Sequence, residues 1–349
     1  MQTSREIVQR CLRFETPERI PRDLWLLPWA EKRYPETIKY ILAQYPSDFT
    51  APDFLYSPSP RIKGDPYSIG LYTDEWGCTF ENIQEGVIGE VKDPQISDLR
   101  GWKSIRPPYE QLPANEGRAL DLINRFCADS DLFVIANICP RPWERYQFLR
   151  GTENALTDLL MAGEEVLGIL QTIHDFYLKE LEFWVRSDVD AIMFMDDWGG
   201  QDQLLIHPEI WREIFKPMYS DYSDLAHSRS KFAFMHSDGY ILPIFPDLIK
   251  AGVDAINSQL FCMDITEIAR TAKGRITFWG EIDRQQVLPS PDPDVGREAV
   301  RYVSKHLYDP KGGLIAQFEF TPGSNPDTAR VLFDEWMRVE QRYKTHPVV

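Results

Sequence analysis

Short apolar segments alternate with longer amphipathic segments along most of the chain. Eight segments predict strands, at residues 22–28, 50–55, 131–138, 189–195, 231–236, 252–257, 275–280 and 313–319. The last six are continuous apolar runs, which are typical of parallel strands buried on both faces. Amphipathic stretches over 153–186, from Pro208 and from Pro326 predict helices. Eight strands, each followed by a helix, predict an α/β fold of the (β/α)₈ TIM-barrel type.

Two further segments add to this barrel. Thr3 and Glu6 have capping-box spacing ahead of an apolar face, which predicts an extra N-terminal helix. Residues 64–113 are rich in Pro and Gly and alternate in polarity, so we expect an inserted β-hairpin and loop over one end of the barrel. Length alone would suggest two domains, but the strand count favours a single barrel domain over residues 1–349.

Composition limits the partners. The 349 residues include 38 Lys and Arg against 54 Asp and Glu, a net charge of −16. Such acidity argues against general binding to nucleic acid or to an anionic membrane surface. No apolar run approaches the roughly 18 residues that a membrane span needs, and no signal-peptide pattern begins the chain. The five scattered cysteines indicate reduced thiols, so we expect a cytoplasmic protein.

Polar residues follow the predicted strands at the barrel end where active sites of this fold lie. They are Asp196, Asp197, His236, Asp238, Asn257, Glu281 and Glu319. His236 and Asp238 are two positions apart and therefore point to the same side of an extended strand, as half of a metal site would. The alternative is a hydrogen-bonded barrel histidine beside a helix-capping aspartate. Of Asp196 and Asp197, we expect one to cap the next segment and the other to face a ligand.

Aromatic and basic residues near the same strand ends, together with Asn257, supply candidate substrate contacts. Trp76, Trp143, Trp198 and Trp279 are candidates to wall a planar ligand, with ordinary core packing as the alternative. Arg141 and Arg145 are candidates to hold an anionic group, with a surface role as the alternative. The sequence has no phosphate-binding loop, no dinucleotide fingerprint and no nucleophile elbow.

A set of motifs in a fixed order then points to a known family. The motifs are Asp74-Glu75-Trp76-Gly77, Asp196-Asp197-Trp198-Gly199, Lys216-Pro217-Met218-Tyr219, His236-Ser237-Asp238-Gly239, residues 252–257 and Trp279-Gly280-Glu281-Ile282-Asp283. In order and spacing this set resembles the uroporphyrinogen decarboxylase superfamily over nearly the whole chain. The resemblance implies a (β/α)₈ barrel with its site at the carboxyl ends of the strands, and a homodimer would be in keeping with it.

The superfamily has two branches, and the chain is more similar to one of them. The decarboxylases carry an N-terminal Arg-Gln-Ala-Gly-Arg segment and a C-terminal histidine, which residues 21–28 and 318–323 lack. The corrinoid-linked methyltransferases bind zinc through a His-x-Cys motif and a second Cys. The corresponding positions here are His236, Asp238 and Glu319, with Glu281 as a candidate fourth ligand. Carboxylates in place of thiolates make the donor set harder and suited to polarising an oxygen.

These inferences combine into a functional hypothesis. A divalent metal, with zinc as the expected ion, would be held by His236, Asp238 and Glu319. The protein would move a methyl group from a small substrate, such as a methoxy-aromatic compound, to a corrinoid carried by a partner protein. Asp196 or Asp197 would orient the substrate or protonate its oxygen. The alternatives are a lyase that acts on tetrapyrrole carboxylates and a non-catalytic tetrapyrrole or corrinoid binder.

Overall fold

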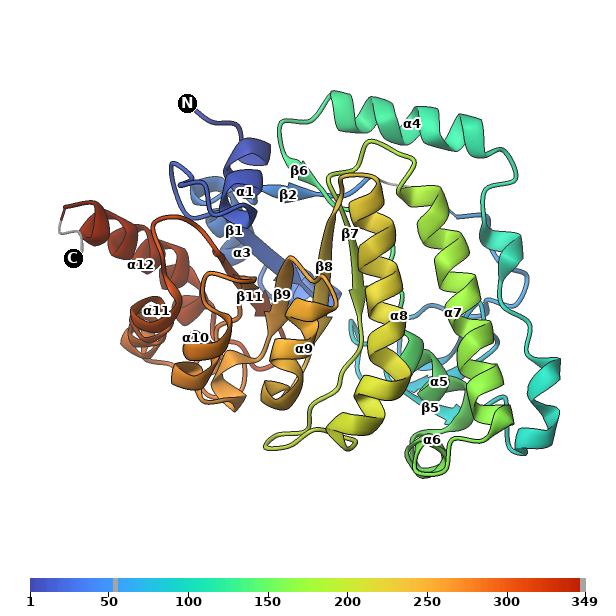
Figure 1. The fold of residues 1–349 in the computed structure, drawn as a ribbon. Coiled ribbons are helices and arrows are strands. Elements are labelled where there is room, and N and C mark those ends of the chain that lie inside the picture. The colour runs from blue at the N-terminus through green and yellow to red at the C-terminus, as the bar shows by residue number, and fades with distance from the viewer. Residues whose placement is uncertain (53–55, 346–349) are drawn as a thin grey trace.

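The computed structural model describes residues 1–52 and 56–345 of the chain. Eight strands form the centre of this part (Figure 1). They are β1 (Arg22–Leu26), β2 (Phe49–Thr50), β6 (Phe133–Val134), β7 (Ala191–Met195), β8 (Phe232–Ser237), β9 (Ala255–Ser258), β10 (Thr277–Trp279) and β11 (Leu314–Phe320). Each overlaps one of the eight predicted segments, and residues 53–55 of the second prediction lie outside the described residues.

Hydrogen bonds join these strands in a ring. Six of them pair side by side, all parallel, in the order β1-β11-β10-β9-β8-β7, and β2 pairs with β6. A parallel bridge between Ile135 and Ala191 joins β6 to β7. The N–H of Asp48, just before β2, donates to the carbonyl of Arg22 in β1 at 2.9 Å. The ring confirms the predicted (β/α)₈ barrel.

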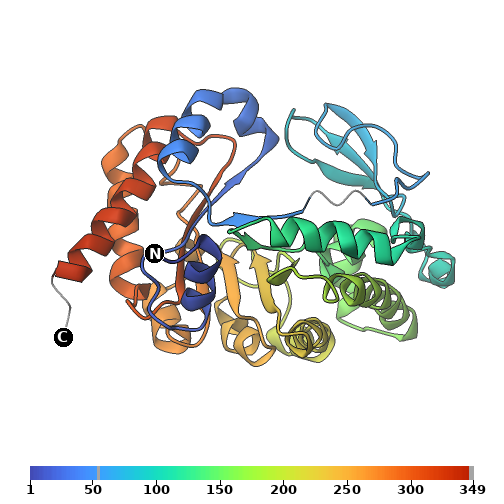
Figure 2. The same cartoon turned by 90° about the horizontal axis from the view of Figure 1, so that it is seen from above.

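Helices follow the strands and surround them (Figure 2). They are α2 (Pro28–Arg33), α3 (Pro35–Gln44), α4 (Glu116–Ala128), α5 (Pro142–Arg150), α6 (Thr152–Leu159), α7 (Glu164–Trp184), α8 (Pro208–Ser228), α9 (Phe245–Lys250), α10 (Ile265–Ala272), α11 (Pro293–Leu307) and α12 (Pro326–Thr345). The helices predicted from Pro208 and from Pro326 are confirmed. The single helix predicted over 153–186 is wrong, because the chain leaves helical geometry before α7, where Gly163 is extended.

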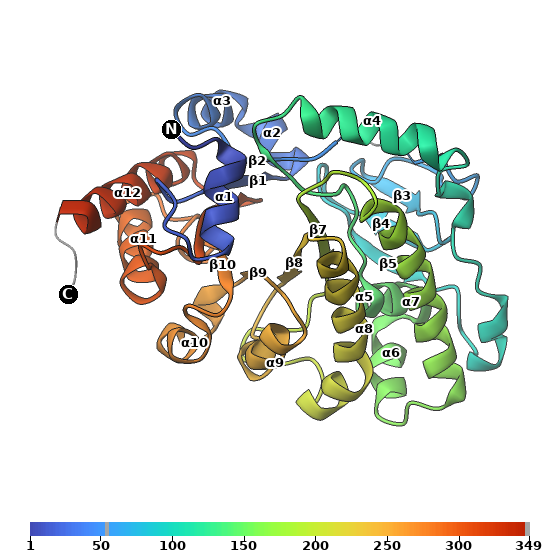
Figure 3. The ribbon, with the colours of Figure 1, turned by 45° about the horizontal axis from the view of Figure 1, so that its top comes forward.

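The insertion contains more sheet than a hairpin. It folds into the antiparallel strands β3 (Gly70–Thr73), β4 (Thr79–Asn82) and β5 (Glu90–Asp93), in that order. It follows β2 and therefore lies at the carboxyl end of the barrel, beside α5 and α7 (Figure 3). The N–H of Ile96 donates to the carbonyl of Leu149 in α5 at 2.8 Å, which ties the insertion to the barrel.

The opposite end of the barrel is closed by the N-terminal helix, as predicted. This helix, α1 (Ser4–Leu12), begins with the expected capping box between Thr3 and Glu6. Its Val8 and Cys11 belong to one apolar cluster with the inward-facing side chains of Phe234 and Trp279. An apolar plug therefore fills the amino end of the ring, and the polar inward-facing side chains gather at the carboxyl end.

Two other expectations concern the cysteines and membrane-spanning segments. The five cysteines are all free thiols. None of the helices in the described ranges is both long enough and apolar enough to cross a lipid bilayer.

Candidate functional site

Strand register brings the predicted polar residues together. In the parallel sheet Met195 of β7 pairs with His236 of β8, and His236 pairs with Asn257 of β9. Side chains alternate along a strand, so residues at matched inward positions of neighbouring strands converge on the barrel axis. His236 and Asn257 are both buried there. The loops after β7 and β8 then add Asp197 and Asp238 at the rim.

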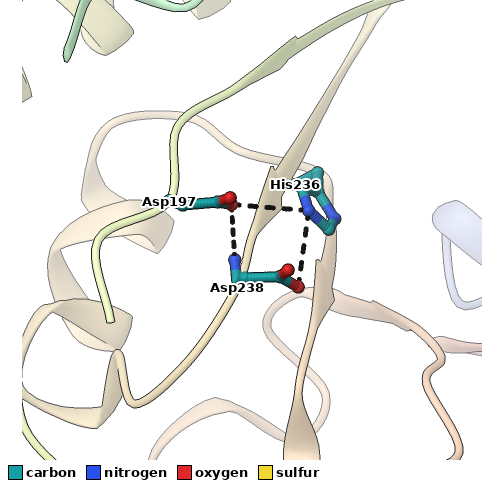
Figure 4. A group of neighbouring side chains, drawn as sticks. All are labelled: Asp197, His236 and Asp238. Carbon is teal, nitrogen blue, oxygen red and sulfur yellow. Dashed lines mark hydrogen bonds and ion pairs between the residues drawn. The ribbon is translucent and has the colours of Figure 1, made fainter. Parts of the chain in front are cut away.

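Asp197, His236 and Asp238 form a compact group, which we call the candidate metal triad (Figure 4). One ligand atom of each residue lies within 4.8 Å of the ligand atoms of the other two. His236 Nε2 is 3.5 Å from Asp197 Oδ1 and 3.5 Å from Asp238 Oδ1. The backbone N–H of Asp238 donates to Asp197 Oδ1 at 2.9 Å, which fixes the two loops against each other.

Asn257, expected as a substrate contact, is fully buried and instead sets the orientation of His236. The side-chain amide nitrogen of Asn257 donates to the carbonyl of Trp279 at 2.5 Å and to the side-chain oxygen of Gln317 at 3.0 Å. Its oxygen is thereby left to accept a hydrogen bond from His236 Nδ1–H, at 2.6 Å. In the neutral ring, Nε2 then carries a lone pair that faces both aspartates. Metal-binding histidines are commonly oriented by such a bond.

Opposing effects act on the His236 ring. Burial lowers the pKa of His236, but the charges of Asp238 and Asp197 and the hydrogen bond that Nδ1–H donates to Asn257 outweigh it, so the pKa is raised. Burial raises the pKa of Asp197, which the charge of His236 partly offsets. The triad is therefore a place where positive charge is stabilised, whether it is a proton or a cation.

Arg284 enters the site from the loop after β10. Its guanidinium pairs with Asp238 and with Glu319, and its Nε is 3.3 Å from Glu281 Oε1. Burial raises the pKa of Glu281 to about 8, although the charge of Arg284 opposes the rise. Burial also raises the pKa of Glu319. The expected metal ligands Glu319 and Glu281 are thus engaged by Arg284, and in the described residues Asp197 completes the triad in place of Glu319.

Asp196 has a different role from its neighbour. It is completely buried, and its carboxylate accepts the N–H groups of Trp143 at 3.0 Å and Glu144 at 2.8 Å, in the first turn of α5. It also accepts the hydroxyl of Tyr219 at 2.6 Å. Burial and the nearby Glu144 raise the pKa of Asp196, and the three donated bonds oppose that rise. Asp196 is therefore a capping residue, but it caps α5, which precedes it in the chain, and not the next segment as expected. Asp197 is the one whose side chain is partly exposed.

Glu144 extends the site on the α5 side. Its side chain is only 13% exposed, and its Oε2 is buried without a partner in the described part of the chain. Burial raises the pKa of Glu144 to about 7, against the opposing charge of Arg141 and with a further upward contribution from Asp197. A carboxyl group with a pKa near neutrality is able to hold and release a proton at physiological pH.

The four predicted tryptophans belong to the core, which is the alternative to walling a planar ligand. All are at least 95% buried. Trp143 and Trp198 stack on each other at 5.2 Å, Trp76 packs edge-on against Phe176, and Trp279 belongs to the apolar plug. Core packing outweighs a surface role because each indole covers a large apolar area. Trp25 of β1 is the indole beside His236, with ring centroids 5.4 Å apart.

The two predicted arginines lie in different environments. Arg141 precedes α5 and remains 31% exposed, 3.9 Å from Glu144 Oε1. Arg145 is buried, pairs with Asp74 and Glu75 of the insertion and lies 5.1 Å from the Trp76 ring. Arg145 therefore ties the insertion to α5, and Arg141 alone stays available to an anionic ligand.

The donor set of the triad fits a divalent cation. Asp238 Oδ1 is buried and has no hydrogen-bond partner among the described residues, and it lies 3.5 Å from His236 Nε2. An imidazole nitrogen and carboxylate oxygens are common ligands of zinc and of other first-row metals. Unsatisfied buried oxygens beside an oriented histidine are what such an ion would compensate.

Sequence reasoning missed Arg284, Glu144 and Trp25. Arg284 follows the Trp279–Asp283 motif directly, so a positive residue in that loop was a usable signal. Glu144 lies three residues after Arg141, at a helix start that faces the same barrel end. Trp25 stands in the first strand at an inward position, two residues after Asp23.

Comparison with known proteins agrees with this architecture. Residues 67–338 match the family model described as uroporphyrinogen decarboxylase (URO-D). A solved structure of a methyltransferase from Methanosarcina mazei is similar over 97% of this chain and 99% of that chain, with a TM-score of 0.69 and 13% identity. At that identity the likeness establishes the fold alone.

Other solved structures are more distant. A putative lyase/mutase from Burkholderia cenocepacia covers 99% of this chain and 91% of its own, with a TM-score of 0.36 and 11% identity. A dihydropteroate synthase from Xanthomonas albilineans covers 48% and 59%, with a TM-score of 0.30 and 12% identity. These two scores carry no inference about the chain. No curated protein sequence matches it.

Proposed function

Because the chain belongs to the uroporphyrinogen decarboxylase family, with a fold like that of a methyltransferase, we propose that it is a metal-dependent methyltransferase. The observation that carries the proposal is the candidate metal triad, with its oriented His236 and its unpartnered Asp238 oxygen. In this proposal the methyl donor is a small methoxy-bearing compound, for which an aromatic ring is the expected carrier. The acceptor is a corrinoid held by a partner protein at the barrel mouth.

The triad residues are the proposed ligands of the cation. His236 would bind through Nε2, and Asp197 and Asp238 through carboxylate oxygens. A divalent metal, with zinc as the expected ion, would supply a Lewis acid for an oxygen of the donor. Arg284 would keep Glu319 and Glu281 turned toward itself and so limit the negative charge that the metal alone must balance.

The transfer also requires a proton. When the donor's C–O bond breaks, the acceptor supplies the electron pair for its new bond to the methyl carbon. The oxygen left behind keeps the electron pair of the C–O bond and becomes a hydroxyl only if it gains a proton. Glu144 is the proposed source, through Oε2, because its pKa of about 7 keeps a protonated fraction available. Asp196 is unsuited to this task because its oxygens hold α5 and Tyr219.

A decarboxylase reaction is the competing proposal, since the family takes its name from it. A porphyrinogen carries many carboxylates and needs a basic pocket. The site instead gathers Asp238, Glu281 and Glu319 around Arg284, with Asp197 beside Asp238. This acidic surplus favours a cation over a polyanion.

The test is methyl transfer from a methoxybenzoic acid to free cob(I)alamin by the zinc-loaded protein. We expect turnover in the wild type, a loss of at least about 100-fold in His236→Ala, and little change in His207→Asn, an exposed histidine matched as a control. Equal rates in wild type and His236→Ala would contradict the proposal. Release of CO₂ from uroporphyrinogen would replace it with the lyase, and cobalamin binding without turnover would replace it with a binding role.

A further inference from the structure

A basic groove lies at the amino end of the barrel, remote from the triad. Two adjoining cavities of about 230 and 520 Å³ form it, and they share Arg19, Ile20, Glu340 and Lys344 as lining residues. Arg22 is the first residue of β1 and Leu314 the first of β11, which places the groove at the strand starts, against α12. We call this feature the basal groove.

Positive charge is concentrated there in an otherwise acidic chain. The groove is lined by Arg19, Arg22, Lys273, Lys305 and Lys344. The carboxylates that line it are Asp309 and Glu340, while the whole chain carries a charge of −16. A local reversal of sign attracts anions, because charges grouped in a concave low-dielectric surface reinforce one another.

Some of these cations already have partners. Arg19 pairs with the carboxylate of Asp48 through both terminal nitrogens, one of them at 2.6 Å. Lys344 Nζ lies 2.5 Å from Glu340 Oε1. These pairs engage Asp48 and Glu340. Arg22, Lys273 and Lys305 form no ion pair in the described residues, and Lys273 Nζ donates to the carbonyl of His306 at 3.1 Å.

Arg22 differs from the two lysines in having a buried side-chain nitrogen without a hydrogen-bond partner in the described part of the chain. Its side chain is half-buried, and its Nε is buried with no hydrogen-bond partner within residues 1–52 and 56–345. Its guanidinium carbon lies 5.8 Å from the centroid of the Tyr45 ring. Burial and the neighbouring charge of Arg19 lower the pKa of Arg22, and the charges of Asp48 and Glu340 offset only part of that fall. An unpaired charge of this kind is costly unless something else neutralises it.

We propose that the basal groove is a binding site for a small multivalent oxyanion, with phosphate or carboxylate groups. The guanidinium fork of Arg22 would pair with one such group, and Lys273 and Lys305 with another across the larger cavity. Guanidinium groups bind both anions through paired N–H donors. The site is separate from the triad, so it stands or falls independently of the methyltransferase proposal.

The test is calorimetric titration of the full chain in phosphate-free, low-salt buffer, with pyrophosphate in one arm and citrate in the other. We compare the wild type with Arg22→Gln, Lys305→Gln and the control Arg118→Gln, an exposed arginine on α4. We expect saturable binding of one equivalent. Affinity should fall at least tenfold in Arg22→Gln, fall less in Lys305→Gln, and stay unchanged in the control. The arm with the tighter binding identifies the anion class.

Thermal denaturation provides the second readout. Without an added anion, Arg22→Gln should unfold at the same or a higher temperature than the wild type, because an uncompensated charge has been removed. Adding the anion should raise the unfolding temperature of the wild type by more than it raises that of the variant. Absence of saturable binding to the wild type in both arms would overturn the proposal. Equal affinities in Arg22→Gln and Arg118→Gln would also overturn it, since they would mean diffuse attraction.

Discussion

Two adjacent aspartates after β7 have opposite environments. Asp196 is fully buried and accepts three hydrogen bonds, two from the α5 backbone and one from Tyr219. The side chain of Asp197 is 39% exposed, and its Oδ1 faces His236 Nε2 across 3.5 Å. The first is a satisfied structural anchor, and the second belongs to a group whose oxygens are incompletely satisfied.

The difference between them shows how support and site can be told apart. A buried carboxylate that caps a helix has most of its hydrogen-bonding capacity used by the fold and is closed to a ligand from solvent. The triad keeps an unpartnered Asp238 oxygen and an oriented His236 nitrogen, at a cost in stability that a bound cation would offset. Asp196 therefore stabilises the frame in which Asp197 operates.

The largest expected effect is a difference in protein stability between substitutions of these two aspartates. Asp196→Ala leaves the N–H groups of Trp143 and Glu144 and the hydroxyl of Tyr219 without their acceptor, so it should lower the free energy of unfolding by about 3 kcal/mol or more. Asp197→Ala should change it by no more than about 1 kcal/mol. Urea denaturation of both variants measures the contrast. Equal losses of unfolding free energy in the two variants would contradict the assignment of Asp196 as a structural residue and Asp197 as a site residue.

A second prediction uses the buried Glu281. Its pKa is raised from 4.5 to about 8, so the folded protein binds this proton more tightly than the unfolded chain does. The stabilisation is present in full below pH 4.5 and is lost as the pH rises to about 8, on the order of a few kcal/mol. Glu281→Gln should therefore flatten the dependence of stability on pH over this range, in metal-free protein. A wild-type stability that rises from pH 5 to 8 and an unchanged slope in the variant would contradict the assignment.

A third prediction concerns the orientation of His236. Asn257→Ala removes the acceptor for Nδ1–H but none of the proposed ligands. Zinc affinity should fall by about 10- to 100-fold, the usual effect of removing a group that orients a metal ligand. Competition with a chromogenic chelator measures this loss, and Asn257→Asp, which keeps an acceptor oxygen, should recover part of it. Unaltered affinity in Asn257→Ala would mean that His236 does not need this partner.

The smallest expected effect concerns Arg284. This guanidinium pairs with Asp238 and competes with a cation for its charge. Arg284→Gln should therefore tighten zinc binding, by up to about tenfold. The same chelator assay measures it, with Arg118→Gln as the charge-matched control. Weaker binding in Arg284→Gln would show that the arginine supports the ligands rather than competing for them.

Much of the fold follows from the apolar pattern. Continuous apolar runs located all six strands from β6 to β11, because strands buried on both faces leave this strong signal. The split between α6 and α7 was missed because both helices continue the same amphipathic period and only Gly163 interrupts it. The third strand of the insertion was missed because short exposed strands lack an apolar signature.

The site was less accessible to sequence reasoning. Two-residue spacing correctly put His236 and Asp238 on one side, since strand geometry is local. Whether Glu319 or Asp197 lies beside them depends on the loop after β10, which brings Arg284 between the carboxylates. No periodic pattern in the sequence indicates where a single guanidinium such as that of Arg284 lies relative to distant residues. The buried tryptophans show the same limit. Nothing in the local sequence distinguishes a tryptophan that lines a ligand site from one that packs in the core.

Zinc titration of the metal-free protein tests the central claim most directly. Isothermal calorimetry on wild type, His236→Ala and His207→Asn, with metal analysis of each, should show one bound equivalent in the wild type and in His207→Asn. Binding should fall by at least about 100-fold in His236→Ala. A wild type that binds no zinc, or a His236→Ala variant that binds it as tightly as the wild type, would contradict the assignment of Asp197, His236 and Asp238 as a metal site.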